Sequence, residues 1–89
     1  MKYALLVIEK PEKPAHDRNQ EWLLLLHEIG TAAGNAKGIE NLRESFWQIP
    51  LHSGLPFLGE CIRLADKDKF RWQVLILDDE PSWIHSQPT

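Results

Sequence analysis

Apolar positions along this chain follow two different periods. The stretches YALLVIE (3–9) and FRWQVLILD (70–78) are short, mostly apolar runs that contain β-branched or aromatic residues, and this composition predicts strands. The stretches at 18–34 and 54–68 repeat apolar residues every three to four positions, which is typical of amphipathic helices. The chain is therefore predicted to alternate between strands and helices.

Each expected helix has one apolar side. Asp17 and Ser53 are the expected N-caps, because their side-chain oxygens can accept hydrogen bonds from the free N–H groups of a first helical turn. The first apolar arc consists of Trp22, Leu25, Leu26, Ile29, Ala32 and Ala33, and the second of Leu55, Leu58, Cys61, Ile62, Leu64 and Ala65. Leu24 falls outside the first arc, beside Glu28 and Thr31. The expected core comprises Val7, Leu26, Ile29, Leu58, Ile62, Trp72, Val74 and Ile76.

The segment GIENLRESFWQIPL (38–51) can be interpreted in two ways. Residues 38–43 form either one helical turn or the edge strand of a β-hairpin whose second strand is SFWQIPL (45–51). With the hairpin, the order becomes βαββαβ, which resembles the ferredoxin-like α/β plait and implies an α+β fold. Without it, the alternative is a small three-stranded parallel βαβαβ sheet. The resemblance includes no functional motif, so it implies no active residue.

Composition limits the classes of function. The 89 residues suit one domain, with 80–89 as a C-terminal tail, and 43% hydrophobic with 26% charged residues is typical of a globular protein. A net charge of -3 argues against nucleic-acid binding, which needs a basic surface, so a nucleic-acid-associated plait is a lesser alternative. The single cysteine, Cys61, and the lack of a signal peptide or an apolar run of about 18 residues predict a cytoplasmic protein without a membrane segment.

One edge of the expected sheet collects polar side chains. Strands 45–51 and 70–78 are joined through one helix, so they should run parallel and end at the same edge. That edge carries His52, Ser53, Asp78, Asp79 and Glu80, which makes a small enzyme or a metal-binding protein one alternative. The sequence has no G-x-S-x-G turn and no close His or Cys pair. The structural interpretation is a capped helix beside a solvated strand end, so no catalytic residue, metal or cofactor is assigned.

The strands carry more apolar residues than a sheet with one covered face requires. Strand 70–78 places Val74 and Ile76 on one face, yet Leu75 and Leu77 on the other. The C-terminal tail, a second copy or another protein must cover the second face. The candidate interface residues are Leu24, Leu75, Leu77, Trp83 and Ile84. The leading interpretation is a small, non-enzymatic binding or regulatory protein that forms a homodimer.

Overall fold

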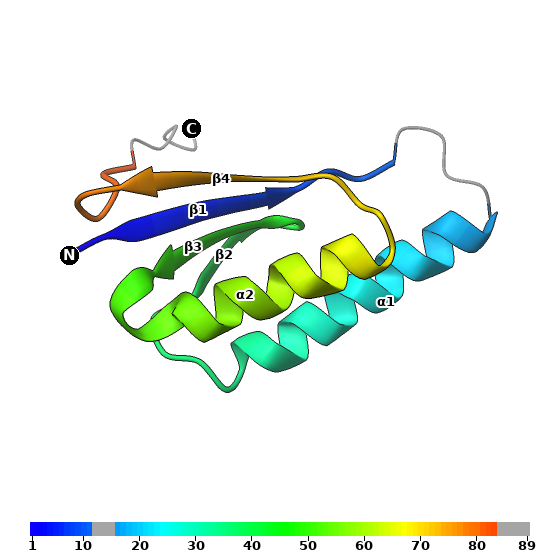
Figure 1. Ribbon diagram of the computed structural model, residues 1–89, viewed down its shortest axis with the longest axis horizontal. Helices are drawn as coiled ribbons and strands as arrows, with labels where there is room; N and C mark the ends of the chain where they lie inside the picture. Colours follow the sequence, from blue (N-terminus) through cyan, green and yellow to red (C-terminus); the bar gives the residue numbers. More distant parts are fainter. Residues whose placement is uncertain (12–15, 84–89) are drawn as a thin grey trace, which may run out of the picture.

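The computed structural model describes residues 1–11 and 16–83, which form a four-stranded sheet with two helices against one of its faces (Figure 1). The elements are β1 (Tyr3–Ile8), α1 (His16–Ala33), β2 (Glu40–Arg43), β3 (Phe46–Pro50), α2 (Leu51–Lys67) and β4 (Trp72–Leu77). The α+β class predicted from the sequence is confirmed. Residues 40–43 are a strand and not a helical turn.

The sheet has the strand order β2-β3-β1-β4, and every neighbouring pair is antiparallel. The alternative of a three-stranded parallel sheet is therefore wrong for the described residues. At the hairpin turn, the side-chain amide of Asn41 donates to the backbone oxygens of Arg43 at 2.6 Å and Phe46 at 3.3 Å. Since β3 and β4 are both antiparallel to β1, they run in the same direction, and their ends share one edge as predicted.

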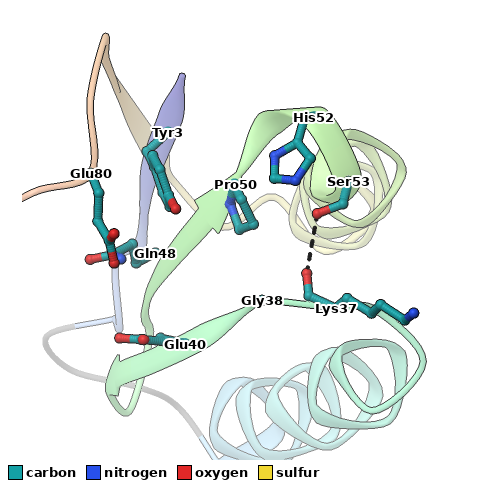
Figure 2. Close-up of a pocket in the computed structure, with 9 residues that line it drawn as sticks. All are labelled: Tyr3, Lys37, Gly38, Glu40, Gln48, Pro50, His52, Ser53 and Glu80. Carbon is teal, nitrogen blue, oxygen red and sulfur yellow. Dashed lines mark hydrogen bonds between the residues drawn. The ribbon is translucent and has the colours of Figure 1, made fainter. Parts of the chain in front are cut away.

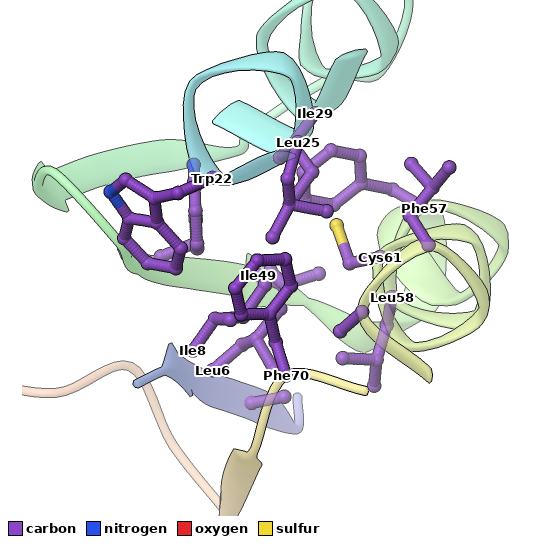
Figure 3. Packing of buried hydrophobic residues seen from close by; sticks show 14 residues of the cluster. Leu6, Ile8, Trp22, Leu25, Ile29, Ile49, Phe57, Leu58, Cys61 and Phe70 are labelled. Atoms are coloured by element: carbon purple, nitrogen blue, oxygen red, sulfur yellow. The ribbon is translucent and has the colours of Figure 1, made fainter. Parts of the chain in front are cut away.

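The core lies between the sheet and the two helices (Figure 3). The register pairs Ala4 with Ile49 and Leu6 with Trp47, which places these side chains together on the helix-covered face. The helices contribute the buried side chains Trp22, Leu25, Ile29, Phe57, Leu58, Cys61, Leu64 and Ala65. Phe70 closes one end of the core, with its ring edge-on to Trp22 at a centroid distance of 5.4 Å.

Helix α2 buries most of the predicted arc, namely Leu58, Cys61, Leu64 and Ala65, but its first turn packs differently from the prediction. Leu55 is 59% exposed, whereas Phe57, which the predicted arc omits, is buried. The cause is Gly54, which is buried where α2 passes β3: a Cβ there would lie only 2.5 Å from Cγ2 of Ile49. Because the helix contacts the strand at this glycine, Leu55 turns toward solvent. Asp17 lies within α1, and its side chain is outside the described part of the chain.

The predicted core is confirmed in part. Ile29 and Leu58 are buried, while Leu26, Ile62, Trp72 and Val74 are partly buried against the core. Val7 lies on the opposite face, since the register places it beside Phe46 and Gln73. Ile76 is 49% exposed, so its predicted burial is wrong. It points to the helix side, but β4 is the outermost strand, and α2 packs on β3 and β1.

Candidate functional site

The sheet face away from the helices is largely apolar. Three residues of each of the three longer strands point to this face: Tyr3, Leu5 and Val7 from β1, Phe46, Gln48 and Pro50 from β3, and Gln73, Leu75 and Leu77 from β4. This assignment follows from the register, because directly paired residues point to the same side of a sheet. We call this surface the open face.

The chain's own C-terminal segment covers the β3 side of the open face. The indole Nε1–H of Trp83 donates a hydrogen bond to Oε1 of Gln48 at 2.8 Å. The same indole packs edge-on to Phe46, with ring centroids 6.1 Å apart. Gln48 is only 2% exposed, so this bond provides a partner for a polar group enclosed within the sheet surface. From the sequence, the tail, a second copy and another protein are the candidates for covering this face. The tail covers at least the β3 side of it.

Apolar side chains of β4 stay exposed on both sides of the sheet. Leu75 on the open face is 57% exposed and Ile76 on the helix side is 49% exposed, whereas Leu77 is half-buried. Leu24 is 56% exposed but belongs to α1, in the helix layer, with the equally exposed Leu23 beside it. Of the predicted interface residues, Leu75, Leu77 and Trp83 therefore share one surface and Leu24 lies on another. Ile84 lies outside the described residues.

The polar edge of the sheet contains a small hollow of about 270 Å³ (Figure 2). Three of the five predicted edge residues line it, namely His52, Ser53 and Glu80. Tyr3, Lys37, Gly38, Glu40, Gln48 and Pro50 complete the lining. Asp78 and Asp79 are exposed in the bend that follows β4. The structure thus brings together part of the predicted cluster, and adds residues from the loop before β2 that sequence spacing did not indicate.

Strand β3 passes directly into α2 at this edge, and the predicted N-cap is wrong. Pro50 is the N-cap residue, with φ -71° and ψ 123° and no side-chain capping bond. The Leu51 N–H is instead satisfied by the backbone oxygen of Lys2 at 2.9 Å, which continues the β1–β3 pairing into the first residue of the helix. Ser53 consequently lies inside the first turn, and its hydroxyl donates to the Lys37 backbone oxygen at 3.3 Å.

The chemistry available in the hollow is hydrogen bonding to a polar molecule. Ser53 is exposed, and its described partner is the Lys37 carbonyl oxygen, which cannot take up the proton that a serine nucleophile must lose. His52 is exposed beside it. Within residues 1–11 and 16–83, no group of three His, Cys, Asp or Glu side chains is placed to hold a metal ion.

A second depression, of about 510 Å³, lies between the helices and is lined by His27, Glu28, Thr31, Glu60, Arg63, Leu64 and Lys67. Its main feature is the ion pair of Glu60 and Arg63, in which Nε donates to Oε2 at 3.0 Å. The hydrogen bond from Arg63 lowers the pKa of the Glu60 carboxyl, and both side chains are well exposed. An exposed pair one helical turn apart is an ordinary feature of a solvated helix surface.

Cys61 has no access to solvent. Burial raises the pKa of its thiol to about 12, so it stays protonated and unreactive. In the part of the chain that the structure describes, neither helix has the length and apolar character that crossing a bilayer requires.

Comparison with protein-family models, with curated proteins and with solved structures finds no match to this chain.

Proposed function

We propose that this chain is a small, non-enzymatic protein-binding module that forms a homodimer through β4 and the adjacent open face. The observation that carries the proposal is the exposure of Leu75 and Ile76 on opposite sides of the same edge strand. Large apolar side chains that remain exposed together at a sheet edge are typical of an interaction surface.

The cover provided by the tail restricts this surface to β4. Trp83 contacts Phe46 and Gln48, both in β3, so this indole lies over the β3 part of the open face. The apolar residues of β4 are separated from β3 by β1. A second copy that covers β4 would bury Leu75 and Ile76 and complete the coverage that the tail begins.

The same proposal includes the finer class of the fold, the ferredoxin-like plait. The chain order βαββαβ and the place of β1 between β3 and β4 support it. This class of fold hosts many unrelated activities, so it adds nothing to the choice of function. A cytoplasmic location is part of the proposal and is supported by the reduced, buried thiol of Cys61.

Sedimentation equilibrium of the full chain tests the proposal. Measurements from about 1 μM to about 1 mM cover association free energies of about −8 to −4 kcal/mol, the range expected for a transient dimer. We expect a monomer–dimer equilibrium in this range. A chain that stays monomeric throughout would overturn the proposal.

Two lysine variants locate the surface. Leu75→Lys should shift the equilibrium to monomer, because it places a charge where two apolar surfaces meet. Leu55→Lys is the matched control, since Leu55 is 59% exposed in α2 and should tolerate the same change without effect on association. Dissociation by Leu24→Lys, with Leu75→Lys still dimeric, would instead place the interface on the helix layer and contradict the proposed surface.

A further inference from the structure

The two edges of the sheet differ in how far they prevent pairing with another strand. At one edge, β2 has four residues, ENLR, and an irregularity between Asn41 and Arg43. Short length, charge and a bulge all discourage the addition of a further strand. At the other edge, β4 has six residues, WQVLIL, with no charge, proline or bulge. Of the two edge strands in the described residues, β4 is therefore the one with a regular edge.

The backbone groups available at that edge follow from the pairing with β1. The N–H of Glu9 donates to the Arg71 oxygen at 2.8 Å, and the register pairs Leu5 with Leu75. In an antiparallel pair, hydrogen-bonded positions alternate along the strand, so the odd-numbered residues of β4 direct their N–H and C=O groups to β1. The even-numbered residues Trp72, Val74 and Ile76 direct theirs outward.

The four residues before β4 carry two basic side chains and one acidic one, Asp68, whereas the charged residues directly after β4 are all acidic. Lys69 and Arg71 precede the strand, while Asp78, Asp79 and Glu80 follow it. In an antiparallel pair of two β4 strands, the basic end of each lies beside the acidic end of the other. This charge arrangement complements itself under two-fold symmetry, which is the symmetry of the commonest protein dimers.

We propose that the β4 strands of two copies pair antiparallel about a two-fold axis at Leu75, which joins the two sheets into one of eight strands. The inference rests on the proposed function, and it specifies how the dimer forms. In this register the outward groups of Val74 bond those of the partner's Ile76, and Leu75 lies opposite the partner's Leu75. Arg71 then lies at the end of the pairing where the acidic bend of the partner, which follows its β4, begins. The helix layers of both copies stay on the same side of the joined sheet, since paired residues point to the same face.

A second copy fits this edge better than a segment of another protein, for two reasons. The register that sets Leu75 against itself also brings the opposite charges together, so one shift of the strands satisfies both. The exposed apolar side chains of β4 lie on both sides of the sheet, and a folded copy carries apolar side chains at the matching positions on both sides. An extended peptide would need the same alternation together with the same charges at its ends.

Single introduced cysteines test the register. In Leu75→Cys the two thiols belong to a directly opposed, non-hydrogen-bonded pair with a Cα separation of about 4.5 Å, which is within the range of a disulfide. In the matched control Gln73→Cys, which is exposed on the same face, the two copies of the residue are four positions apart along the strands, about 13 Å. The native Cys61 is buried and should not react in either variant.

Under mild oxidation of the folded chain, Leu75→Cys should cross-link faster than Gln73→Cys, on the order of tenfold or more. The reason is that thiols held in one dimer react at an effective concentration in the millimolar range. Val74→Cys tests the register in which the two-fold axis lies at residue 74 and not at residue 75. Faster cross-linking of Val74→Cys than of Leu75→Cys would overturn the proposed axis.

The failure of this inference is distinguishable from that of the proposed function. If the native chain sediments as a dimer but Leu75→Cys and Gln73→Cys cross-link at equal rates, the dimer exists and the β4 pairing is wrong. If the native chain is a monomer at every concentration, both proposals fall. Pairing of β4 with a segment of another protein would then be the remaining use of this edge.

Discussion

Gly54 should be the position in α2 at which the smallest side-chain addition does the most harm. A Cβ at Gly54 would lie 2.5 Å from Cγ2 of Ile49 and 3.1 Å from Cδ1 of Ile39. The Ile39 atom is the end of a flexible side chain and can move aside. The Ile49 atom cannot, because this buried side chain is β-branched and holds one rotamer. Alanine at Gly54 must therefore push α2 away from β3.

Gly59 is the matched control, because it lies in the same helix and a Cβ there would meet no heavy atom within 4 Å. Replacing a helical glycine with alanine gains about 0.8–1 kcal/mol of helix stability at either position. Overpacking at Gly54 should oppose this gain by about 1–3 kcal/mol. Gly59→Ala is thus expected to stabilise the fold by nearly 1 kcal/mol, whereas Gly54→Ala should lie between no change and about 2 kcal/mol of destabilisation.

Urea unfolding of both variants, followed by circular dichroism, measures the two free energies under one set of conditions. The difference between the variants isolates the packing, since the gain in helix propensity is common to both. A Gly54→Ala variant as stable as Gly59→Ala would refute the reasoning, because it would mean that α2 does not approach β3 at Gly54.

Three further measurements test other parts of the structure. Trp83→Phe keeps an aromatic ring but removes the donor to Gln48, so unfolding should become easier by about 0.5–1.5 kcal/mol, and unchanged stability would argue against the tail contact. Burial raises the pKa of the Cys61 thiol from its ordinary value to about 12, so the unfolded chain loses this proton at a lower pH than the folded chain does. The stability of the native chain relative to Cys61→Ala should therefore be constant below about pH 8 and fall as the pH rises through 9 to 12, and a flat difference would contradict the buried thiol. Leu58→Ala should lower the free energy of unfolding by about 2–5 kcal/mol and Leu55→Ala by less than about 0.5 kcal/mol, and equal losses would mean that α2 presents the other face to the core.

The elements with a clear hydrophobic period could be predicted from the sequence, and the faces they bury only in part. The strand YALLVI and the helix around Trp22 and Ile29 carry strong patterns, and the structure has them close to the predicted bounds. Only the first turn of α2 was mispredicted, because Gly54, a residue without a side chain, lies against β3 there and Leu55 faces solvent. A hydrophobic arc is defined by apolar side chains. It therefore leaves out a glycine that packs closely against a strand because it has no side chain.

The polar edge shows a second limit of sequence patterns. Ser53 has the residue type and place of an N-cap, but the backbone oxygen of Lys2 meets the first N–H of α2 instead. That bond joins residues far apart in the chain and depends on β1 and β3 pairing, so local spacing does not indicate it. The contact between Trp83 and Gln48 is equally distant in sequence, although a glutamine within the apolar run FWQIP is a local sign that a polar partner is needed.

The stability of a single folded copy does not require an exposed apolar side chain on β4. Leu75 is more than half exposed, so a lysine there would remove little buried area and should change the free energy of unfolding by less than about 0.5 kcal/mol. A charged residue at position 75 would leave a single copy about as stable as leucine does. It would also protect the edge from unwanted pairing, as the charged residues of β2 do. An effect of Leu75→Lys on association but not on folding would therefore assign this leucine to contact with another chain. A large loss of stability in the monomer would instead mean that Leu75 belongs to the core, and the argument for an interface at β4 would fail.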